Sequence, residues 1–395
     1  MRSVRRIGMS LALLAIAAPT MAAERWRTVW LASPIGWEPT SKKAYPRPLA
    51  DQTVAQTIRV LGAGGRIRVR LTNELGTSPL AIGAASVAIG EGAPVPLRFG
   101  GVQGATIPAG APLYSDPVAL PVRAGTLLTV RIHYPASATP AAHAQMVRLT
   151  AGDTTGRATA AGEEYRTAGL VSAVEVAAPA TPARVLVTFG DSITEGAGAS
   201  EAGRTSWPAQ VAALLDAQPA TRCWTVVNAG ISGNRLLHDG RGPNALARFD
   251  RDVASVPGAT HLVLLEGIND IGAGKGKPAE AVEAADIIAA YRQIIDRAHA
   301  AGLKVIGGTL LPYVGAAYQD AAGEAKRVSV NRWIRTSGAF DAVIDFDAAT
   351  RAPEAPDRLI AGFEIGDHLH PNDTGYAAMA RAARPVIAAQ GCPRR

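Results

Sequence analysis

The sequence predicts two folded units, an all-β sandwich or jelly roll over residues 24–180 and an α/β unit over residues 181–395. Two observations predict this division. Apolar residues in the first unit recur with a period of two, which indicates strands with one solvated face. The second unit alternates near-continuous apolar strands with helical segments, which indicates a parallel sheet covered by helices on both faces.

The β unit shows its alternation in three stretches. Apolar residues occupy every second position at Ile67, Val69 and Leu71, at Val118, Leu120 and Val122, and at Leu128, Val130 and Ile132. Glycine and proline punctuate these runs, and no convincing helical pattern occurs among them. Residues 174–183 (VEVAAPATPA) are small and proline-rich, as is typical of a linker, so we place the boundary between the units near residue 180.

The α/β unit is expected to contain strands in the segments VLVTFG, TVVNAG, HLVLLEG, LKVIGGTLL and AFDAVIDF. Helices are expected over residues 207–217, 278–301 and 374–389. Ligands of such sheets bind beyond the carboxyl ends of the strands. Polar residues that directly follow a strand are therefore the first candidates for a functional site.

The N-terminus is typical of a secretory signal peptide over residues 1–23. Three arginines, at positions 2, 5 and 6, precede an apolar stretch from about Ile7 to Ala18, and small residues follow as far as Ala23. The apolar stretch is too short to cross a bilayer. We expect cleavage after Ala22 or Ala23, export to the periplasm or the medium, and no stable membrane insertion.

The composition argues against nucleic-acid binding. The chain has 395 residues, 48% of them hydrophobic and 18% charged, with a formal net charge of +7. The positive charge is dispersed, without a long basic run or a basic stripe that contains aromatic residues, so we expect a basic soluble surface. The sequence does not indicate an oligomeric state.

Cys223 and Cys392 are the two cysteines of the chain. They form no CxxC motif, so a zinc or redox motif is not expected. In an α/β fold both would lie at the end of the sheet opposite the functional site. A single disulfide suits an oxidising compartment, and two free thiols are the alternative.

Polar clusters follow three of the predicted strands, and a fourth cluster precedes the last helix. They contain Asp191 and Ser192; Asn228, Gly230 and Ser232-Gly233-Asn234; Gly267, Asn269 and Asp270; and Asp367, His368, His370 and Asn372. One parallel sheet would bring all four to the same rim.

These residue types fit ester hydrolysis. A serine hydroxyl needs a base to remove its proton, and a histidine serves when a carboxylate holds its other ring nitrogen. Ser192 is the candidate nucleophile, His370 the base, and Asp367 its orienting carboxylate. The developing oxyanion needs fixed donors, for which we propose the backbone N–H groups of Ser192 and Gly230 and the amide of Asn269.

The four clusters resemble the conserved blocks of the SGNH, or GDSL, hydrolase superfamily, in the family's order. The matching residues are Gly190-Asp191-Ser192, Gly230, Gly267-Ile268-Asn269-Asp270 and Asp367-His368-Leu369-His370. The resemblance covers residues 184–390. It implies a flavodoxin-like three-layer α/β/α domain with five parallel strands, and serine esterase activity through an acyl-enzyme without a metal or organic cofactor.

A finer resemblance concerns a bacterial subgroup described as XynE-like, which is associated with xylan-type esterases and carries a β-rich N-terminal region. The similar stretches are RIRVRLTNELGTSPLAIGAASVA, LLHDGRGPNALARFDRD, RTSGAFDAVIDFDAA and GDHLHPNDTGYAAMA. This resemblance suggests a short acyl ester as substrate, with acetyl on a polysaccharide or oligosaccharide as the leading case.

Several residues allow alternative interpretations. The candidates for lining the substrate site are Asp191, Asn234, His238, Asp270 and His368. His238 could equally lie in a surface turn, and Asp367, His368 and His370 could instead bind zinc. Residues 272–277 (GAGKGK) lack the spacing of a phosphate-binding loop, so we interpret them as a solvated loop. We assign no role to the remaining histidines, at positions 133, 143, 261 and 299.

Two other functions remain open at this point. The first is lipase, lysophospholipase or thioesterase activity on longer acyl chains, against which the absence of a long apolar lid segment argues. The second is a glycan-binding protein whose hydrolase half is inactive, against which the intact Ser192, His370, Asn269 and Gly230 argue. The β unit could bind glycan or shape the cleft.

Overall fold

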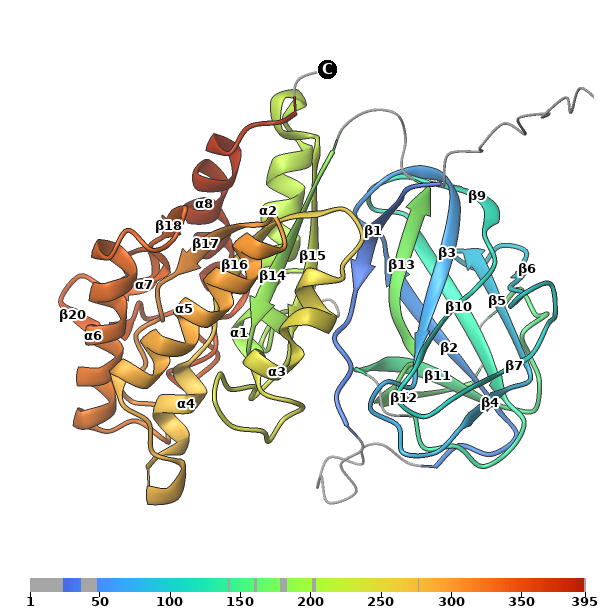
Figure 1. The fold of residues 1–395 in the computed structure, drawn as a ribbon, viewed down its shortest axis with the longest axis horizontal. Helices are drawn as coiled ribbons and strands as arrows, with labels where there is room; N and C mark the ends of the chain where they lie inside the picture. Colours follow the sequence, from blue (N-terminus) through green and yellow to red (C-terminus); the bar gives the residue numbers. More distant parts are fainter. Residues whose placement is uncertain are drawn as a thin grey trace, which may run out of the picture.

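The computed structural model describes residues 24–36, 48–140, 143–159, 162–177, 183–200, 204–275 and 277–393. The predicted signal peptide, residues 1–23, lies outside the described residues. Figure 1 shows the antiparallel β unit and the α/β unit side by side.

The β unit is built from two antiparallel sheets. The five-stranded sheet has the order β1-β13-β3-β8, with β9 also paired to β3. Its strands are β1 (Trp26–Leu31), β13 (Val171–Ala177), β3 (Gly64–Thr72), β8 (Pro112–Tyr114) and β9 (Val118–Val122). The six-stranded sheet runs β12 (Glu163–Ala168), β11 (Ala144–Ala151), β2 (Gln52–Arg59), β10 (Leu127–Tyr134), β5 (Ala84–Ile89) and β6 (Val95–Pro96). A separate pair joins β4 (Leu80–Ile82) to β7 (Ala105–Ile107).

The core of the β unit confirms the alternation seen in β3 and β10. Ile67, Val69, Leu128 and Val130 are fully buried in one shared hydrophobic cluster. The expectation of a solvated outer face is wrong at β10, where Arg131 is only 1% exposed. Its guanidinium donates a 2.6 Å hydrogen bond to the carbonyl of Ala158, so a loop covers this part of the sheet.

The first residues of the predicted linker belong to a strand. Val174 and Val176 belong to β13, where they face the core opposite Val69 and Ile67 of β3. Small and β-branched residues suit a fully buried strand as well as a linker, which is why composition alone misplaced this segment. Residues 178–182 lie outside the described part of the chain.

The α/β unit contains a parallel sheet with the order β15-β14-β16-β17-β18. The strands are β14 (Arg184–Gly190), β15 (Trp224–Gly230), β16 (Ala259–Leu265), β17 (Lys304–Gly308) and β18 (Ala342–Ile344). In chain order this is the 2-1-3-4-5 arrangement of flavodoxin-like folds, as expected. Such sheets bind ligands where the strand order reverses, at the carboxyl end of β14 between β15 and β16.

Helices cover both faces of this sheet. Those on and around it are α1 (Ser192–Glu195), α2 (Trp207–Asp216), α3 (Ala245–Phe249), α4 (Ile268–Ala273), α5 (Ala284–Ala300), α6 (Ala321–Thr336), α7 (Phe346–Thr350) and α8 (Asp373–Ala389). Helix α2 packs against α8, and α5 packs against α6 on the other side of the sheet (Figure 1). Short 3₁₀ turns (Pro219–Thr221, Pro278–Glu280), a π-helical turn (Asp250–Ala254) and the ribbon β19 (Arg351–Ala352)–β20 (Ala355–Leu359) complete the unit.

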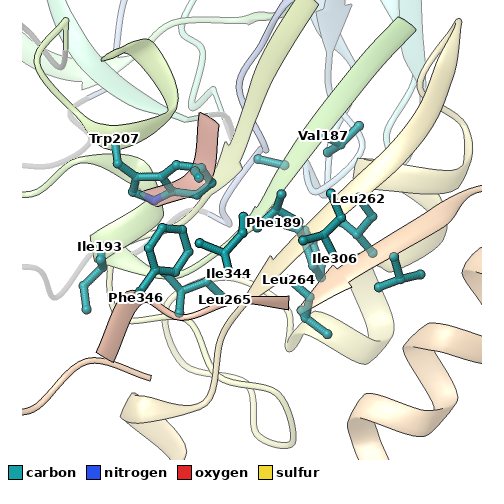
Figure 2. Packing of buried hydrophobic residues seen from close by; sticks show 14 of the residues in the cluster. Val187, Phe189, Ile193, Trp207, Leu262, Leu264, Leu265, Ile306, Ile344 and Phe346 are labelled. Carbon is teal, nitrogen blue, oxygen red and sulfur yellow. The ribbon is translucent and has the colours of Figure 1, made fainter. Parts of the chain in front are cut away.

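Large aromatic and aliphatic side chains fill the space between the sheet and its helices. Figure 2 shows the Trp207 ring beside Phe346, where the ring centroids lie 5.1 Å apart. Phe189 lies at the end of β14 and meets Phe249 edge-on at 6.3 Å. This packing fixes the strand end that leads directly into Ser192.

Five helices, α1, α3, α4, α6 and α7, are not among those predicted from the sequence, and α6 and α3 show two reasons. Helix α6 buries Gly323, Arg327 and Asn331 alongside Val330 and Ile334, so its inner face is not an apolar stripe. Helix α3 is five residues long and continues into a π-helical turn, which is too short for a periodic pattern. The helix expected from residue 278 instead begins at Ala284, after a 3₁₀ turn.

The two units meet along the edge of the parallel sheet. Strand β1 contacts β15, and the Thr28 N–H donates a 3.0 Å hydrogen bond to the carbonyl of Pro257. Residues 32–36 continue from β1 toward the carboxyl end of β15, where Ile35 packs on Ile231. The β unit therefore reaches the loop that follows β15.

Cys223 and Cys392 form a disulfide with a Cα–Cα distance of 5.9 Å. The bridge ties the start of β15 to the chain after α8, at the end of the sheet opposite Ser192. It closes a loop with a sequence separation of 169 residues, and long loops lose the most entropy in the unfolded state when they are cross-linked.

We expect the double substitution Cys223→Ser and Cys392→Ser to lower the free energy of unfolding by about 2–5 kcal/mol. Urea denaturation followed by tryptophan fluorescence measures this loss. Wild-type protein in a reducing agent should show a similar loss. Equal stability of the oxidised wild type and the double variant would contradict the expectation.

Candidate active site

The turn between β14 and α1 presents Ser192. Gly190 ends the strand, and a Cβ at that position would lie 2.1 Å from the carbonyl oxygen of Leu265, so only glycine fits. The Asp191 carboxylate caps α1 by accepting a 2.9 Å hydrogen bond from the Ile193 N–H. Ser192 thus occupies the first position of the helix, where a backbone N–H has no intrahelical partner.

The structure brings Ser192, His370 and Asp367 together. The Ser192 Oγ lies 2.8 Å from His370 Nε2, and His370 Nδ1 lies 2.6 Å from an Asp367 carboxylate oxygen. The other carboxylate oxygen of Asp367 accepts the backbone N–H groups of Leu369 and His370. This arrangement can remove the serine proton and stabilise the imidazolium that results.

The pKa of Asp367 reflects these contacts. Partial burial raises the pKa of this carboxyl, but hydrogen bonds from the His370 ring and from the N–H groups of His370 and Leu369 outweigh that effect and lower it. The carboxylate therefore stays ionised at neutral pH. In that form it accepts the Nδ1 proton and leaves His370 Nε2 free to act as a base.

Asn372 holds the two ends of the loop that carries Asp367 and His370 together. The Asn372 side chain donates to the carbonyls of Gly362 and Glu364 and caps α8. His368 lies in this loop with a positive φ of 58° and an exposed side chain, 3.5 Å from Glu364. Its ring is on the rim, whereas the ring of His370 reaches Ser192.

The oxyanion role expected for Gly230 requires correction. The Gly230 N–H already donates a 2.8 Å hydrogen bond to the Asn228 side chain. A Cβ at Gly230 would lie 2.2 Å from the backbone nitrogen of Glu195, so this glycine allows α1 to pack against β15. The residue is essential to the geometry, but its N–H is not available to a substrate.

Gly233, in the loop that follows β15, offers an alternative backbone donor. Its φ of 76° is in the left-handed region that favours glycine, and its N–H has no acceptor within the described residues. Asn269, at the start of α4, donates one amide proton to the carbonyl of Asn234 at 3.0 Å. The Tyr318 hydroxyl lies 3.4 Å from the Asn269 side-chain oxygen, which fixes the amide orientation. The second amide proton of Asn269 remains available.

Three residues expected to line the substrate site lie beneath it. Asp191 and Asn234 are 1% exposed, and Asp270 is fully buried. Asp270 accepts the N–H groups of Leu236 and Leu237, and Asn234 donates to the carbonyls of Arg241 and Pro243. Their polar groups hold the loop after β15. His238 and His368 are the two candidates that keep exposed surface.

Arg248, in α3, is a buried cation under the site that the sequence analysis did not single out. Its guanidinium donates to the carbonyl of Gly190 at 2.9 Å, to that of Ala229 at 2.7 Å and to Asn234 at 2.8 Å, and it pairs with Asp252 at 3.1 Å. It thereby links the carboxyl ends of β14 and β15.

Buried carboxyl groups surround this arginine. Burial raises the pKa of Asp191 to about 7 and raises that of Glu266 well above its ordinary value. Burial also raises the pKa of Asp270, against the opposing effect of the two backbone N–H groups that it accepts. A raised pKa reduces the negative charge beneath the nucleophile, which would otherwise oppose the development of an oxyanion.

The remaining histidines have separate structural roles. His133 pairs with Asp51 at 3.1 Å and His299 with Asp341 at 2.9 Å. Burial lowers the pKa of His261 to about 4, and this ring packs edge-on against Trp224. His143 faces Glu195, directly behind the candidate site. Its sequence neighbours gave no sign of this partner, because the two residues come from different units.

Neither the alternative zinc site nor a phosphate-binding loop is supported by the described contacts of the residues concerned. The described residues contain no group of three or more His, Cys, Asp or Glu side chains that could hold a metal ion. The Lys275 ammonium donates to the carbonyls of Ala317 and Gln319, and Lys277 lies 3.4 Å from Glu280. Both lysines therefore contact the protein rather than forming a cradle.

Comparisons with known proteins match the α/β unit. Residues 188–378 match the model of the GDSL-like lipase/acylhydrolase family. Similar solved structures include an acetylxylan esterase from Geobacillus stearothermophilus, with 24% identity, coverage of 52% of this chain and 95% of that chain, and a TM-score of 0.42. No curated protein matched the chain.

Two further solved structures have a similar extent. An α/β hydrolase enzyme from the metagenome of Lake Arreo, Spain, is 21% identical over 52% of this chain and 96% of that chain, with a TM-score of 0.41. A GDSL-like lipase from Bacteroides thetaiotaomicron is 19% identical over 52% of this chain and 89% of that chain, with a TM-score of 0.40.

We expect Arg248→Met to lower the free energy of unfolding by about 3–5 kcal/mol, because buried Asp252 would lose its buried cationic partner and the buried acceptors at the ends of β14 and β15 would each lose one hydrogen bond. Chemical denaturation of the full chain measures this. Arg222→Met is the matched control, since Arg222 is an exposed arginine 3.8 Å from Asp216. Losses of the same size in both variants would show that the contacts of Arg248 stabilise the fold no more than an exposed ion pair does.

Proposed function

We propose that this protein, a serine esterase whose residues 188–378 belong to the GDSL-like lipase/acylhydrolase family, removes short acyl groups, foremost acetyl, from a polysaccharide or oligosaccharide. The observation that carries the catalytic assignment is the continuous hydrogen-bonded chain from Ser192 through His370 to Asp367. The proposed catalytic residues are these three.

The reaction follows from this geometry. His370 Nε2 takes the proton of the Ser192 hydroxyl as its oxygen attacks the acyl carbonyl. The N–H groups of Ser192 and Gly233 and the amide of Asn269 hold the oxyanion. The C–O bond to the alcohol then breaks, and His370 gives its proton to the departing oxygen. Water then attacks the acyl-enzyme as His370 takes its proton, and His370 returns that proton to the departing Ser192 oxygen as the carboxylic acid is released.

The surface near the triad supports a polar substrate with a short acyl group. Six large apolar side chains are exposed among the described residues, and of these only Ile365 lies in a segment that carries a triad member. Its neighbours Glu364, Asp367 and His368 are polar. A long acyl chain would need a continuous apolar groove to leave water. The XynE-like stretches quoted above support a carbohydrate as the alcohol component.

Export of the protein is part of this proposal. The N-terminal sequence has the order of charged, apolar and small residues that a signal peptide requires. The Cys223–Cys392 disulfide supports folding in an oxidising compartment. No described helix has the length and apolar character needed to cross a membrane.

Ser192→Ala should reduce hydrolysis of p-nitrophenyl acetate by about 10⁴-fold or more, because no other hydroxyl occupies the position of the nucleophile. A circular dichroism spectrum and melting temperature like those of the wild type would establish that the fold is intact. Full residual activity in the folded variant would refute the assignment.

The two histidines of the loop supply a matched control. His370→Ala should abolish turnover, whereas His368→Ala should retain most of it because the exposed His368 ring lies beside Glu364, while His370 is the ring hydrogen-bonded to Ser192. Turnover should also withstand EDTA. The reverse pattern, or inactivation by EDTA, would favour the zinc interpretation of this loop.

Acyl-chain preference tests the substrate class. Hydrolysis of p-nitrophenyl esters should decline steeply from acetyl to octanoyl and palmitoyl, because the site offers little apolar surface. Acetate release from a panel of acetylated polysaccharides, measured in parallel, should identify the alcohol component. A preference for palmitoyl esters would favour a lipase or lysophospholipase, and no turnover of any ester would favour a glycan-binding protein.

A further inference from the structure

Glu195, the last residue of α1, stands between the proposed nucleophile and the β unit. One of its carboxylate oxygens accepts the backbone N–H of Ser232, and the other lies 3.3 Å from His143 Nε2. Burial raises the pKa of this carboxyl, but His143 and the Ser232 N–H outweigh that effect and lower the pKa to about 2. Glu195 is therefore a buried carboxylate in the ionised form.

His143 belongs to the β unit, directly before β11, and is buried. Its Nδ1 lies 2.8 Å from the carbonyl of Ser33. A carbonyl only accepts, so Nδ1 must carry a proton. A hydrogen bond from Nε2 to Glu195 then requires a second proton, which makes the ring a cation. Burial lowers the pKa of His143, but Glu195 and the Ser33 carbonyl outweigh that effect and raise it.

The other charged group facing this pair is Arg166 of β12. Its guanidinium lies 3.7 Å from Glu195, and its side chain is 56% exposed. An exposed, solvated charge at this distance contributes little. It lowers the pKa of His143 slightly without replacing the buried contact.

Ser232 connects this pair to the oxyanion site. It is followed by Gly233, whose N–H is free to meet the substrate, and then by Asn234, whose carbonyl holds Asn269. The β unit makes a second contact with this loop, because Ile35 packs on Ile231. Residues 231–234 are thus held from one side by the β unit and from the other by Arg248.

We propose that the β unit is a working part of the esterase site, in which cationic His143 acts as a positioning residue. It fixes Glu195 and, through the Ser232 N–H, sets the loop that presents Gly233 and Asn269 to the oxyanion. This inference rests on the proposed ester hydrolysis. It gives the β unit a role in turnover that does not depend on glycan binding.

The test compares His143→Gln with His133→Gln in the full chain, using p-nitrophenyl acetate. His133 is the matched control, since it pairs with the carboxylate of Asp51 in the same unit and not with Glu195. We expect His143→Gln to lower kcat roughly tenfold at nearly constant KM, because small displacements of catalytic groups cost this much. His133→Gln should retain the wild-type kcat. A His143→Gln variant with a wild-type kcat would overturn the proposal.

The dependence of kcat on pH distinguishes a positioning role of His143 from a role in the stability of the fold alone. A histidine with a raised pKa gives its full stabilisation below the pKa of the free side chain and loses it as the pH rises through the folded value. The wild-type kcat should therefore fall on the alkaline side, and His143→Gln should lack this fall. A wild-type kcat that stays constant across the alkaline range would overturn the proposal without any variant.

If His143→Gln does not fold, Glu195→Gln is the second test variant. Glutamine has the same shape as glutamate and keeps an oxygen that can accept the Ser232 N–H. It should show the same loss of kcat, and the double variant should lose no more than either single one. Strictly additive losses would contradict a shared role. Wild-type protein inactive toward every ester would refute the proposed function itself, whereas active wild type with unchanged variants would refute only the positioning role.

Discussion

The guanidinium of Arg248 is the contact on which the rest of the site depends. The backbone carbonyls of Gly190 and Ala229 lie at the carboxyl ends of β14 and β15, under Ser192 and the loop that follows β15, and the Gly190 carbonyl also accepts the Ile231 N–H. Arg248 donates to both, at Gly190 and Ala229, and also holds Asn234. A buried charge is costly unless it is paired and fully hydrogen-bonded. Its geometry therefore restricts how β14 and β15 can end.

Much of the geometry of the candidate site could be predicted because it follows from topology. Parallel strands deliver the residues after them to one rim, so Ser192 and Asn269 could be located from the strands that precede them, and His370 from the last helix. Gly230 and Gly233 could not be distinguished in this way. Both follow β15, and the difference lies in a side-chain acceptor, Asn228, and in a positive φ that the sequence does not reveal.

Two failures of sequence interpretation share one physical cause, the burial of polar groups. Helix α6 buries Arg327 against Glu324 and Asp347, so its inner face has no apolar stripe. Arg131 looked like a residue on a solvated face and is covered by a loop. Buried polar groups are stable only with specific partners, and those partners come from distant parts of the chain. Local patterns therefore cannot reveal them.

Two histidines of this protein work in opposite protonation states. His370 must be neutral at Nε2 to accept the serine proton, and it lies at a partly exposed rim beside Asp367. His143 must be charged to bridge a carbonyl and a buried carboxylate. This second requirement fails as the pH rises through the pKa of His143, which Glu195 and the Ser33 carbonyl raise. The contact between the two units therefore holds the loop at residues 231–234 below that pH and is lost above it.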